Sequence, residues 1–400
     1  NVFIGKEAAQ NTTDAHDNVV IGVGALGLST SVGDAVIIGR GACNNGNMTS
    51  GADGTVAIGK NALLALTSGS ANIAIGLESL DAATSSHYNI AIGYNALKGA
   101  SDANTTKNIA IGSYALDSIG TNTASRNVCI GHNAGTATTG GDDNVFVGNE
   151  AGESANSGGM NTCIGSEAGK NITTGASNVV VGYRTMGETA SNAITGGANV
   201  VIGRDAGYNM QGATANNTIM GTDAGGSLTT GANNLFLGHD AGITGSPGGN
   251  KTNGSSDICL GDESIDQANI QVDWTVASDK RDKTDVKDLD LGLEFVNKLT
   301  PVTYKWDKRS KYGNKKEEGY DLNAQTPDGT HKEDWLDVGF LAQDVADIEA
   351  SYNYKIADKT NLTTSLSYDG KQYGTQYSKF VPILVKAVQE LSAKNEALEA

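Results

Sequence analysis

A glycine that recurs at a nearly constant interval is the feature that most limits how this chain can fold. It follows three mostly apolar residues, as in the run Asn-Ile-Ala-Ile-Gly from Asn89 to Gly93. The fifteen copies are centred on Gly5, Gly22, Gly39, Gly59, Gly76, Gly93, Gly112, Gly131, Gly148, Gly165, Gly182, Gly203, Gly221, Gly238 and Gly261. Most successive copies are 17 residues apart, and the longest gap is 23. A period of this length predicts a stack of equivalent turns.

The residues before each glycine predict one short β-strand in every turn. They are all apolar except Thr162 and Thr218. Because neighbouring side chains of a strand point to opposite faces, three apolar residues in a row predict a strand buried on both faces, as in a parallel sheet. The glycine is expected to have a positive φ. Asn lies four residues before the glycine in twelve of fifteen copies, which predicts a tight corner and a hydrogen-bonded ladder of stacked amides.

A strand of three residues cannot enclose a core by itself. Each turn must either close on further weak strands of its own chain or share a core with other chains, and we favour the second arrangement, in which each chain supplies one wall of a common prism. The expected fold is mainly β: a repetitive, parallel, trimeric β-roll or β-prism shaft of fifteen rungs over residues 1–266. Loops between the rungs, such as residues 244–249, are expected at the surface, where they can contact a receptor.

Composition divides the chain at about residue 277. The first part holds 46 of the 53 glycines, whereas residues 278–400 hold 40 charged residues. The net charge of −17 argues against nucleic acid and anionic membranes as partners, and no apolar run is long enough to span a membrane. The chain begins inside a repeat without Met, so we expect an N-terminal part that joins other proteins. The four cysteines, Cys43, Cys129, Cys163 and Cys259, are interpreted as core residues rather than disulfides.

Carboxylates recur two residues after the glycine. Asp205, Asp223 and Asp240 belong to consecutive turns, where stacked like charges repel, so they are weak candidates for binding a bridging cation. A solvated acidic ridge is the simpler interpretation. Since the histidines match no metal-ligand spacing and no carboxylate pair stands out for glycosidic cleavage, we expect no metal, no cofactor and no activity on an external substrate.

The Ile-Ala-Ile-Gly repeats resemble the β-roll heads of trimeric bacterial adhesins and the repeat-rich shafts of marine phage fibres. After residue 277 the sequence Ser-Asp-Lys-Arg-Asp-Lys begins, followed by Pro-Val-Thr-Tyr-Lys-Trp at 301–306 and Gly-Phe-Leu-Ala-Gln at 339–343. These motifs resemble the intramolecular chaperone domains of phage endosialidases and tail fibres. The resemblance implies an α+β chaperone domain over 278–400, preceded by a linker, 267–277, that contains a cleavage site.

The resemblance also implies that the chain cuts itself once, between Ala277 and Ser278. Ser278 would be the nucleophile and Lys283, when neutral, the base that takes its proton. The alternative is that these residues only cap and solvate the first turn of the domain. Asp282 stands where the family usually has an apolar residue, and the carboxylates near Lys283 favour its protonated form, so we expect slow or incomplete cutting.

The last residues, 380–400, predict a helix with a coiled-coil seam. Its apolar positions alternate at spacings of three and four, with Asn395 as a polar exception. The seam residues are Val381, Leu384, Val388, Leu391, Asn395 and Leu398. Valine at the a positions with leucine at the d positions favours a coiled coil of two helices. The resemblance implies three helices, and we adopt three.

The sequence therefore predicts a homotrimeric phage tail fibre, part of the virion, that binds a polysaccharide or protein receptor on the host cell. Its C-terminal domain would align three chains, because near-identical rungs invite register slips and parallel pairing between distant segments has a high entropic cost. The alternatives are a cellular trimeric adhesin and a polysaccharide-degrading tailspike.

Overall fold

The computed structural model describes residues 1–101, 103–119, 124–187, 193–272, 274–315, 317 and 319–399. These residues form two compact units. The first contains residues 1–243 and 252–260, and the second contains residues 244–251 and 261–400.

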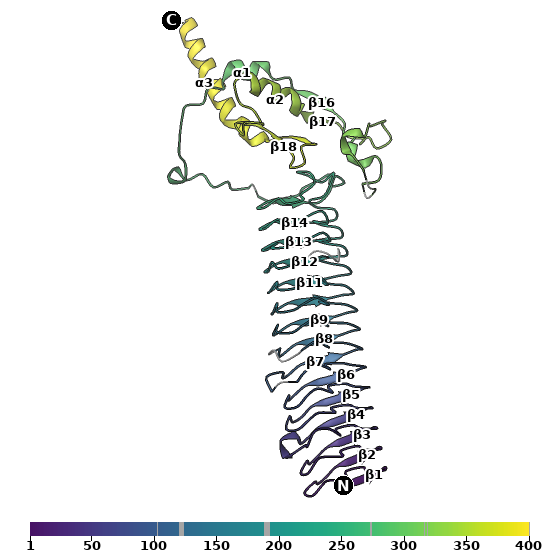
Figure 1. Cartoon of the computed structure of the whole chain (residues 1–400). Coiled ribbons are helices and arrows are strands. Elements are labelled where there is room, and N and C mark those ends of the chain that lie inside the picture. Colours follow the sequence, from purple (N-terminus) through teal and green to yellow (C-terminus); the bar gives the residue numbers. More distant parts are fainter. Residues whose placement is uncertain are drawn as a thin grey trace. The chain divides into compact units, whose positions relative to one another are not determined.

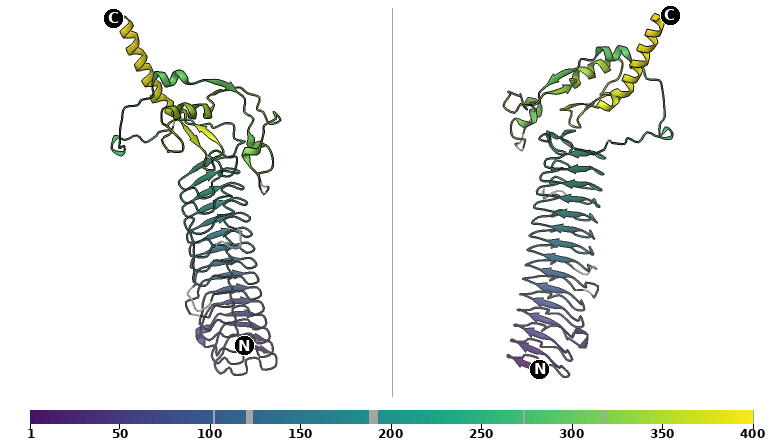
Figure 2. Two further views of the ribbon diagram at one scale, coloured as in Figure 1. Left: turned by 45° about the horizontal axis from the view of Figure 1, so that its top comes forward. Right: turned by 180° about the vertical axis from the view of Figure 1, so that it is seen from behind.

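The first unit is a β-solenoid, a continuous stack of turns with one strand per turn (Figures 1 and 2). Its strands are β1 (Val2–Ile4), β2 (Val19–Ile21), β3 (Val36–Ile38), β4 (Val56–Ile58), β5 (Ile73–Ile75), β6 (Ile90–Ile92), β7 (Ile109–Ile111), β8 (Val128–Ile130), β9 (Val145–Val147), β10 (Thr162–Ile164), β11 (Val179–Val181), β12 (Val200–Ile202), β13 (Thr218–Met220), β14 (Leu235–Leu237) and β15 (Ile258–Leu260). A short 3₁₀ helix, η1 (Ser50–Ala52), lies between β3 and β4. All fifteen strands pair in sequence order in one parallel sheet, which confirms the expected parallel repeat fold.

Each turn closes its own core, so two expectations from the sequence are wrong. The strands are not buried on both faces: in β6 only the middle residue, Ala91, is fully buried, and its two neighbours are half-buried. The chains also need not share a core, because the rest of each turn supplies further inward side chains. In the turn of β6 these are Ala96, Leu97 and Ala100, all fully buried.

The inward side chains of each turn have complementary volumes. Where the middle of the strand is alanine, leucine lies four residues after the glycine: Ala57 with Leu63, Ala74 with Leu80, Ala91 with Leu97, and Ala110 with Leu116. Where the middle residue is larger, glycine takes that position: Cys129 with Gly135, Phe146 with Gly152, Cys163 with Gly169, Val201 with Gly207, Ile219 with Gly225, and Phe236 with Gly242. Five turns depart from this rule: Phe3 with Ala9, Val20 with Leu26, Ile37 with Cys43, Val180 with Met186 and Cys259 with Ile265. Near residue 130 the residue four after the recurring glycine changes from Leu to Gly, and the middle residue of the strand becomes larger. The total volume of the two inward side chains therefore stays similar.

The recurring glycine is required for two reasons. Gly93 has a φ of 138°, a conformation that other residues rarely adopt. A Cβ added to it would lie 2.5 Å from the carbonyl oxygen of Gly112 in the next turn. Neighbouring turns therefore approach too closely here for any side chain, and the predicted positive φ is confirmed.

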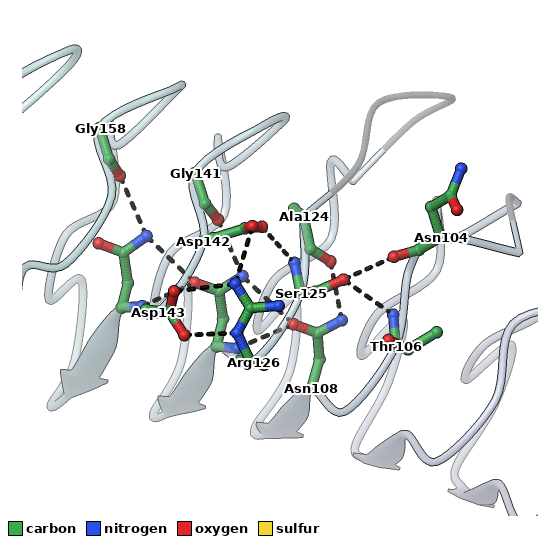
Figure 3. A network of polar contacts seen from close by, with 12 residues as sticks. Asn104, Thr106, Asn108, Ala124, Ser125, Arg126, Gly141, Asp142, Asp143 and Gly158 are labelled. Atoms are coloured by element: carbon green, nitrogen blue, oxygen red, sulfur yellow. Dashed lines mark hydrogen bonds and ion pairs between the residues drawn. The ribbon is translucent and has the colours of Figure 1, made fainter.

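The stacked asparagines form the expected ladder (Figure 3). Asn127 donates from its side-chain amide to Oδ1 of Asn108 (3.2 Å) and to the carbonyl of Gly141 (2.9 Å), and its own Oδ1 accepts from the backbone N–H of Asn144 (2.9 Å). The residue before it, Arg126, has a φ of 61°, which confirms the predicted corner. The ladder pairs polar backbone groups inside a buried corner, where unpaired groups would be costly.

All four cysteines are buried and free, as the sequence indicated. Burial raises the pKa of the Cys129 thiol, since an apolar environment disfavours the thiolate. These thiols are therefore inert core groups.

The second unit is a small mixed domain that ends in a long helix (Figure 1). Its elements are η2 (Lys280–Asp282), α1 (Leu293–Lys298), β16 (Val302–Tyr304), η3 (Arg309–Lys311), η4 (Leu322–Ala324), β17 (Asp337–Gly339), α2 (Ala342–Ser351), β18 (Thr364–Leu366), β19 (Tyr373–Thr375), η5 (Tyr377–Lys379) and α3 (Phe380–Glu399). Strand β16, which lies in the first chaperone motif, pairs in antiparallel fashion with β17, whose last residue, Gly339, begins the second motif. Within the described ranges no helix combines the length and the apolar character needed to cross a membrane.

Helix α3 is built into the core of this domain. Phe380 and Ile383 pack with Phe295 of α1 and Val345 of α2. Further along α3, the carboxylate of Glu390 accepts the backbone N–H of Leu293 at 2.8 Å, which satisfies one free donor at the start of α1. One face of α3 is therefore committed to its own chain.

A buried carboxylate joins α2 to the hairpin of β18 and β19. Glu349 is fully buried and accepts hydrogen bonds from the backbone N–H and hydroxyl of Thr363 and from the hydroxyl of Thr364. These bonds give partners to buried oxygen atoms that would otherwise destabilise the fold.

Changing Gly152 to Leu is expected to destabilise the solenoid by about 1–3 kcal/mol through overpacking, because its Cβ alone would lie 2.6 Å from the ring of Phe146. The backbone does not forbid leucine, since Leu97 has nearly the same φ at the equivalent position, 53° against 57°. The double variant F146A/G152L recreates the Ala–Leu pair and should melt at a higher temperature than either single variant. Gly140→Ala, with no atom within 4 Å of the new Cβ, is the control. Additive losses in the double variant would contradict volume complementarity.

Removing one amide from the ladder is expected to weaken the solenoid more than removing an exposed one. Asn144→Ala leaves the carbonyl of Gly158 and the backbone N–H of Asn161 without their partners, at a cost of about 1–3 kcal/mol each. Asn156→Ala, whose side chain is exposed, is the matched control. Thermal unfolding followed by circular dichroism compares them, and equal melting temperatures would show that the ladder contributes nothing.

Candidate self-cleavage site and assembly surfaces

The predicted nucleophile and base are in contact. The short helix η2 separates Ser278 from Lys283 by one turn of chain, and this turn brings Lys283 Nζ within 2.6 Å of Ser278 Oγ. Both residues and Ala277 are exposed. A serine and an amine at hydrogen-bond distance have the geometry that a nucleophile and its general base require.

The neighbouring charges are distributed differently from the simple cluster that the sequence indicated. Asp279 caps η2 by accepting the backbone N–H of Arg281 at 2.9 Å, and it pairs with the Arg281 guanidinium at 2.6 Å. These bonds lower the pKa of Asp279. Asp279 therefore caps the first turn of the domain, as the alternative interpretation expects. Ser278 and Lys283 instead contact each other.

The cut would fall in an extended, accessible segment. In the described part of residues 267–277 every residue is exposed and none lies in a helix or strand, while Asp273 lies outside the described residues. Such a segment can adapt to the geometry of an attack on its own backbone.

The column of carboxylates on the shaft has positive partners. Arg204 pairs with Asp205 at 2.6 Å and with Asp223 at 3.5 Å. Asp223 and Asp240, together with His239, have ligand atoms within 4.8 Å of one another. The Arg204 guanidinium therefore lies between Asp205 and Asp223, in the position that a bridging cation would take.

The seam residues of α3 lie on the face that its own domain leaves open. Phe380, Ile383 and Ala387 are buried, whereas the predicted seam residues are exposed: Val381 (59%), Leu384 (47%), Val388 (65%), Leu391 (47%), Leu398 (85%) and Asn395. The helix follows its expected range, and only Ala400 lies outside the described residues. The helix therefore carries an apolar face that its own chain does not cover.

A second apolar surface, which sequence reasoning missed, runs along the solenoid. The first and third side chains of each strand point away from the core, and we call their two parallel rows the outer apolar stripe. All its members are apolar except Thr162 and Thr218, and they range from half-buried to exposed, as Ile75 and Ile164 illustrate. The sequence did contain a sign of this stripe. In four consecutive strands the middle, inward residue is alanine and its neighbours are Ile or Val, so the large apolar side chains must point outward.

Residues 244–249 are only partly the surface loop that the sequence predicted, because Pro247 and Gly248 are exposed whereas half of the segment is buried. They belong to the second unit, and Gly245, Ser246 and Gly249 are buried. The cause is packing against residues more than fifty positions later, which a local reading of Gly, Ser and Pro could not detect.

Comparison with known proteins supports the assignment of the C-terminal domain. Residues 278–353 match the protein family described as chaperone of endosialidase. The chain contains a chaperone domain of this kind. The match begins at Ser278, the residue predicted to become the first of the released fragment. No curated protein and no solved structure matched the chain.

Cutting is expected to require both members of the Ser–Lys pair. Ser278→Ala should abolish cleavage, and Lys283→Arg should do the same while keeping the positive charge, because a guanidinium does not lose its proton in proteins. Asp282→Leu should increase cutting. Intact mass spectrometry measures the fragment that begins at Ser278, and its appearance in the Ser278→Ala chain would contradict the assignment.

Proposed function

We propose that this chain is a homotrimeric fibre or tailspike shaft of a phage tail, assembled by its C-terminal chaperone domain and used to attach the virion to a host cell. The observation that carries the proposal is the outer apolar stripe. Monomeric soluble proteins rarely expose contiguous apolar patches larger than a few hundred Å², and this stripe includes two side chains from every one of fifteen strands.

Other copies of the same chain are the best occupant of the stripe. Equivalent rungs of parallel chains present the same residues at the same height, so rotation about an axis along the shaft brings like side chains together along its whole length. Each chain keeps its own core in this arrangement. The trimer therefore differs from the shared-core prism, because chains associate through outward side chains of finished solenoids.

The open face of α3 supports association at the C-terminal end. Its exposed Val and Leu residues repeat at coiled-coil spacing, and the opposite face is fixed to α1 and α2. Three such helices would hold three domains together before the shafts are complete. We take the number three from the chaperone resemblance.

A terminal template is needed because the rungs are nearly interchangeable. Each strand pairs with the next through three residues, all apolar except Thr162 and Thr218, in the same relative register, as in Ile73–Ile90 and Ile90–Ile109. A slip of one rung between chains would keep most apolar contacts, so the contacts alone discriminate poorly against it. Three domains joined at one end fix which rungs meet.

The contact between Lys283 and Ser278 supports self-cleavage after assembly. Ser278 Oγ attacks the carbonyl carbon of Ala277, Lys283 accepts the hydroxyl proton, and the C–N bond breaks as the nitrogen of Ser278 receives a proton. Water then hydrolyses the resulting ester, leaving a carboxylate on Ala277 and free amino and hydroxyl groups on Ser278. A lysine needs to be neutral for this role, and burial promotes that form, so covering by neighbouring chains would couple cutting to assembly.

An aspartate in the outer apolar stripe is expected to disrupt the trimer while leaving the solenoid folded. Ile92→Asp would place a charge in the proposed interface without adding one to the chain's own core, because Ile92 is only half-buried in one chain. Lys107→Ala, at an exposed position, is the control. Native mass spectrometry and circular dichroism give the oligomer and the fold. A wild-type monomer would overturn the proposal, as would an unaffected Ile92→Asp trimer.

Removing the chaperone domain is expected to matter during folding but not afterwards. A chain that ends at residue 277 should give misassembled shafts, whereas proteolytic removal of 278–400 from assembled shafts should leave them intact, since paired rungs no longer need a template. Analytical ultracentrifugation compares the two products. Correctly sized trimers from the truncated gene would contradict the chaperone role.

A further inference from the structure

We propose that the two fragments stay bound to each other after the cut, through a clamp formed by residues 244–251 and Glu263 on one side and residues 308–315 and 367–371 on the other. The clamp residues all belong to the second unit. The first pair of segments precedes the scissile bond in the sequence, and the second pair follows it. The inference rests on the proposed function only for the existence of the cut.

The first part of the clamp is a hydrogen-bonded contact with the turn between β18 and β19. Tyr368 donates its backbone N–H to the carbonyl of Gly248 at 3.1 Å, and Asn250 donates its backbone N–H to Asp369 Oδ2 at 3.1 Å. The buried Lys251 places its ammonium 5.3 Å from the centre of the Tyr368 ring, a favourable cation–π distance. Backbone and side-chain groups from both sides of the cut thus satisfy one another.

Two glycines show how closely the surfaces fit. A Cβ on Gly249 would lie 2.5 Å from Asp369 Oδ1, and one on Gly245 would lie 2.8 Å from Ser310 Cβ. Both glycines have positive φ, 76° and 95°. A side chain at either position would force the two sides of the clamp apart.

The second part of the clamp surrounds Glu263. Its carboxylate pairs with Lys315, and its backbone carbonyl accepts from Lys308 Nζ at 2.9 Å. The Glu263 and Lys315 side chains are only 9% and 17% exposed. An ion pair with so little solvent is weakly screened by salt, and breaking one side of it leaves an unpaired buried charge.

Cleavage changes none of these contacts. The scissile bond lies in the exposed segment that ends at Ala277, and from Ser264 to Ala277 every described residue is exposed. Hydrolysis therefore removes a covalent link without removing buried surface. Chain cutting and domain release become separate events, and the second requires the clamp to open.

The test makes the cut without relying on the Ser–Lys pair. In the full chain carrying Ser278→Ala, residues 268–272 are replaced by the recognition sequence of a specific protease, and the protease is added after assembly. Size-exclusion chromatography in about 0.15 M salt should then show both fragments in one peak. Separate elution of the C-terminal fragment from the otherwise unaltered chain overturns the proposal.

Variants locate the contact. Gly249→Val and Glu263→Gln should each speed dissociation about tenfold or more, the change expected from losing charged or buried hydrogen bonds. The conservative Asp369→Asn should act in the same direction, which covers the case in which Gly249→Val fails to fold. Asp358→Asn, at an exposed position of the same domain, should leave release unchanged.

Release rates equal to wild type in all three clamp variants would overturn the clamp even if the fragments co-elute. Failure of Ser278 and Lys283 to cut the natural chain would contradict only the self-cleavage proposal.

Discussion

The fixed volume enclosed by one turn of the solenoid governs the rest of this structure. Successive turns approach so closely at the glycine column that no Cβ fits, and this approach sets a repeating backbone with little freedom to expand. The inward side chains must then fill a nearly constant space. Alanine facing leucine and phenylalanine facing glycine are two solutions to the same packing requirement, so the sequence varies while the shape of the turn does not.

Polar groups inside the turn are satisfied by the same repetition. An asparagine amide bonds to the asparagine of one neighbouring turn and to a backbone carbonyl of the other, so each rung depends on both of its neighbours. A solenoid of this kind gains stability rung by rung, through contacts between near neighbours.

Repetition also creates the problem that the C-terminal domain is suited to solve. Uniform rungs give an uninterrupted outer apolar stripe, which favours association but distinguishes poorly between registers. The chaperone-type domain does not continue the rungs: its buried Glu349 and the exposed face of α3 each occur at one place in the chain. A non-repeating element at one end can define a register that the repeating element cannot. The proposed clamp around Glu263 and Asp369, within the second unit, would then keep the two fragments bound after the cut.

Much of this protein follows from its sequence, because the repeat is short and the special positions are local. The period of the repeat predicted the rungs, and the recurring glycine and asparagine predicted the positive φ and the amide ladder. The motifs that begin at Ser278 indicated the domain and its Ser–Lys pair. These features depend on a few adjacent residues and on stacking of identical neighbours. The spacing of Val381, Leu384 and Val388 likewise placed one face on the last helix.

Only the tertiary structure decided which side of each strand faces the core. Three consecutive apolar residues are compatible with burial on both faces, and the distinction depended on how the remaining residues of the turn folded back, with Leu97 inward and Ile92 outward. The pairing of Phe146 with the space over Gly152 is a matter of volume rather than of local propensity. The hydrogen bond from Asn250 to Asp369 joins segments more than one hundred residues apart. Such contacts depend on the shape of both partners, and no periodicity or motif within one segment encodes them.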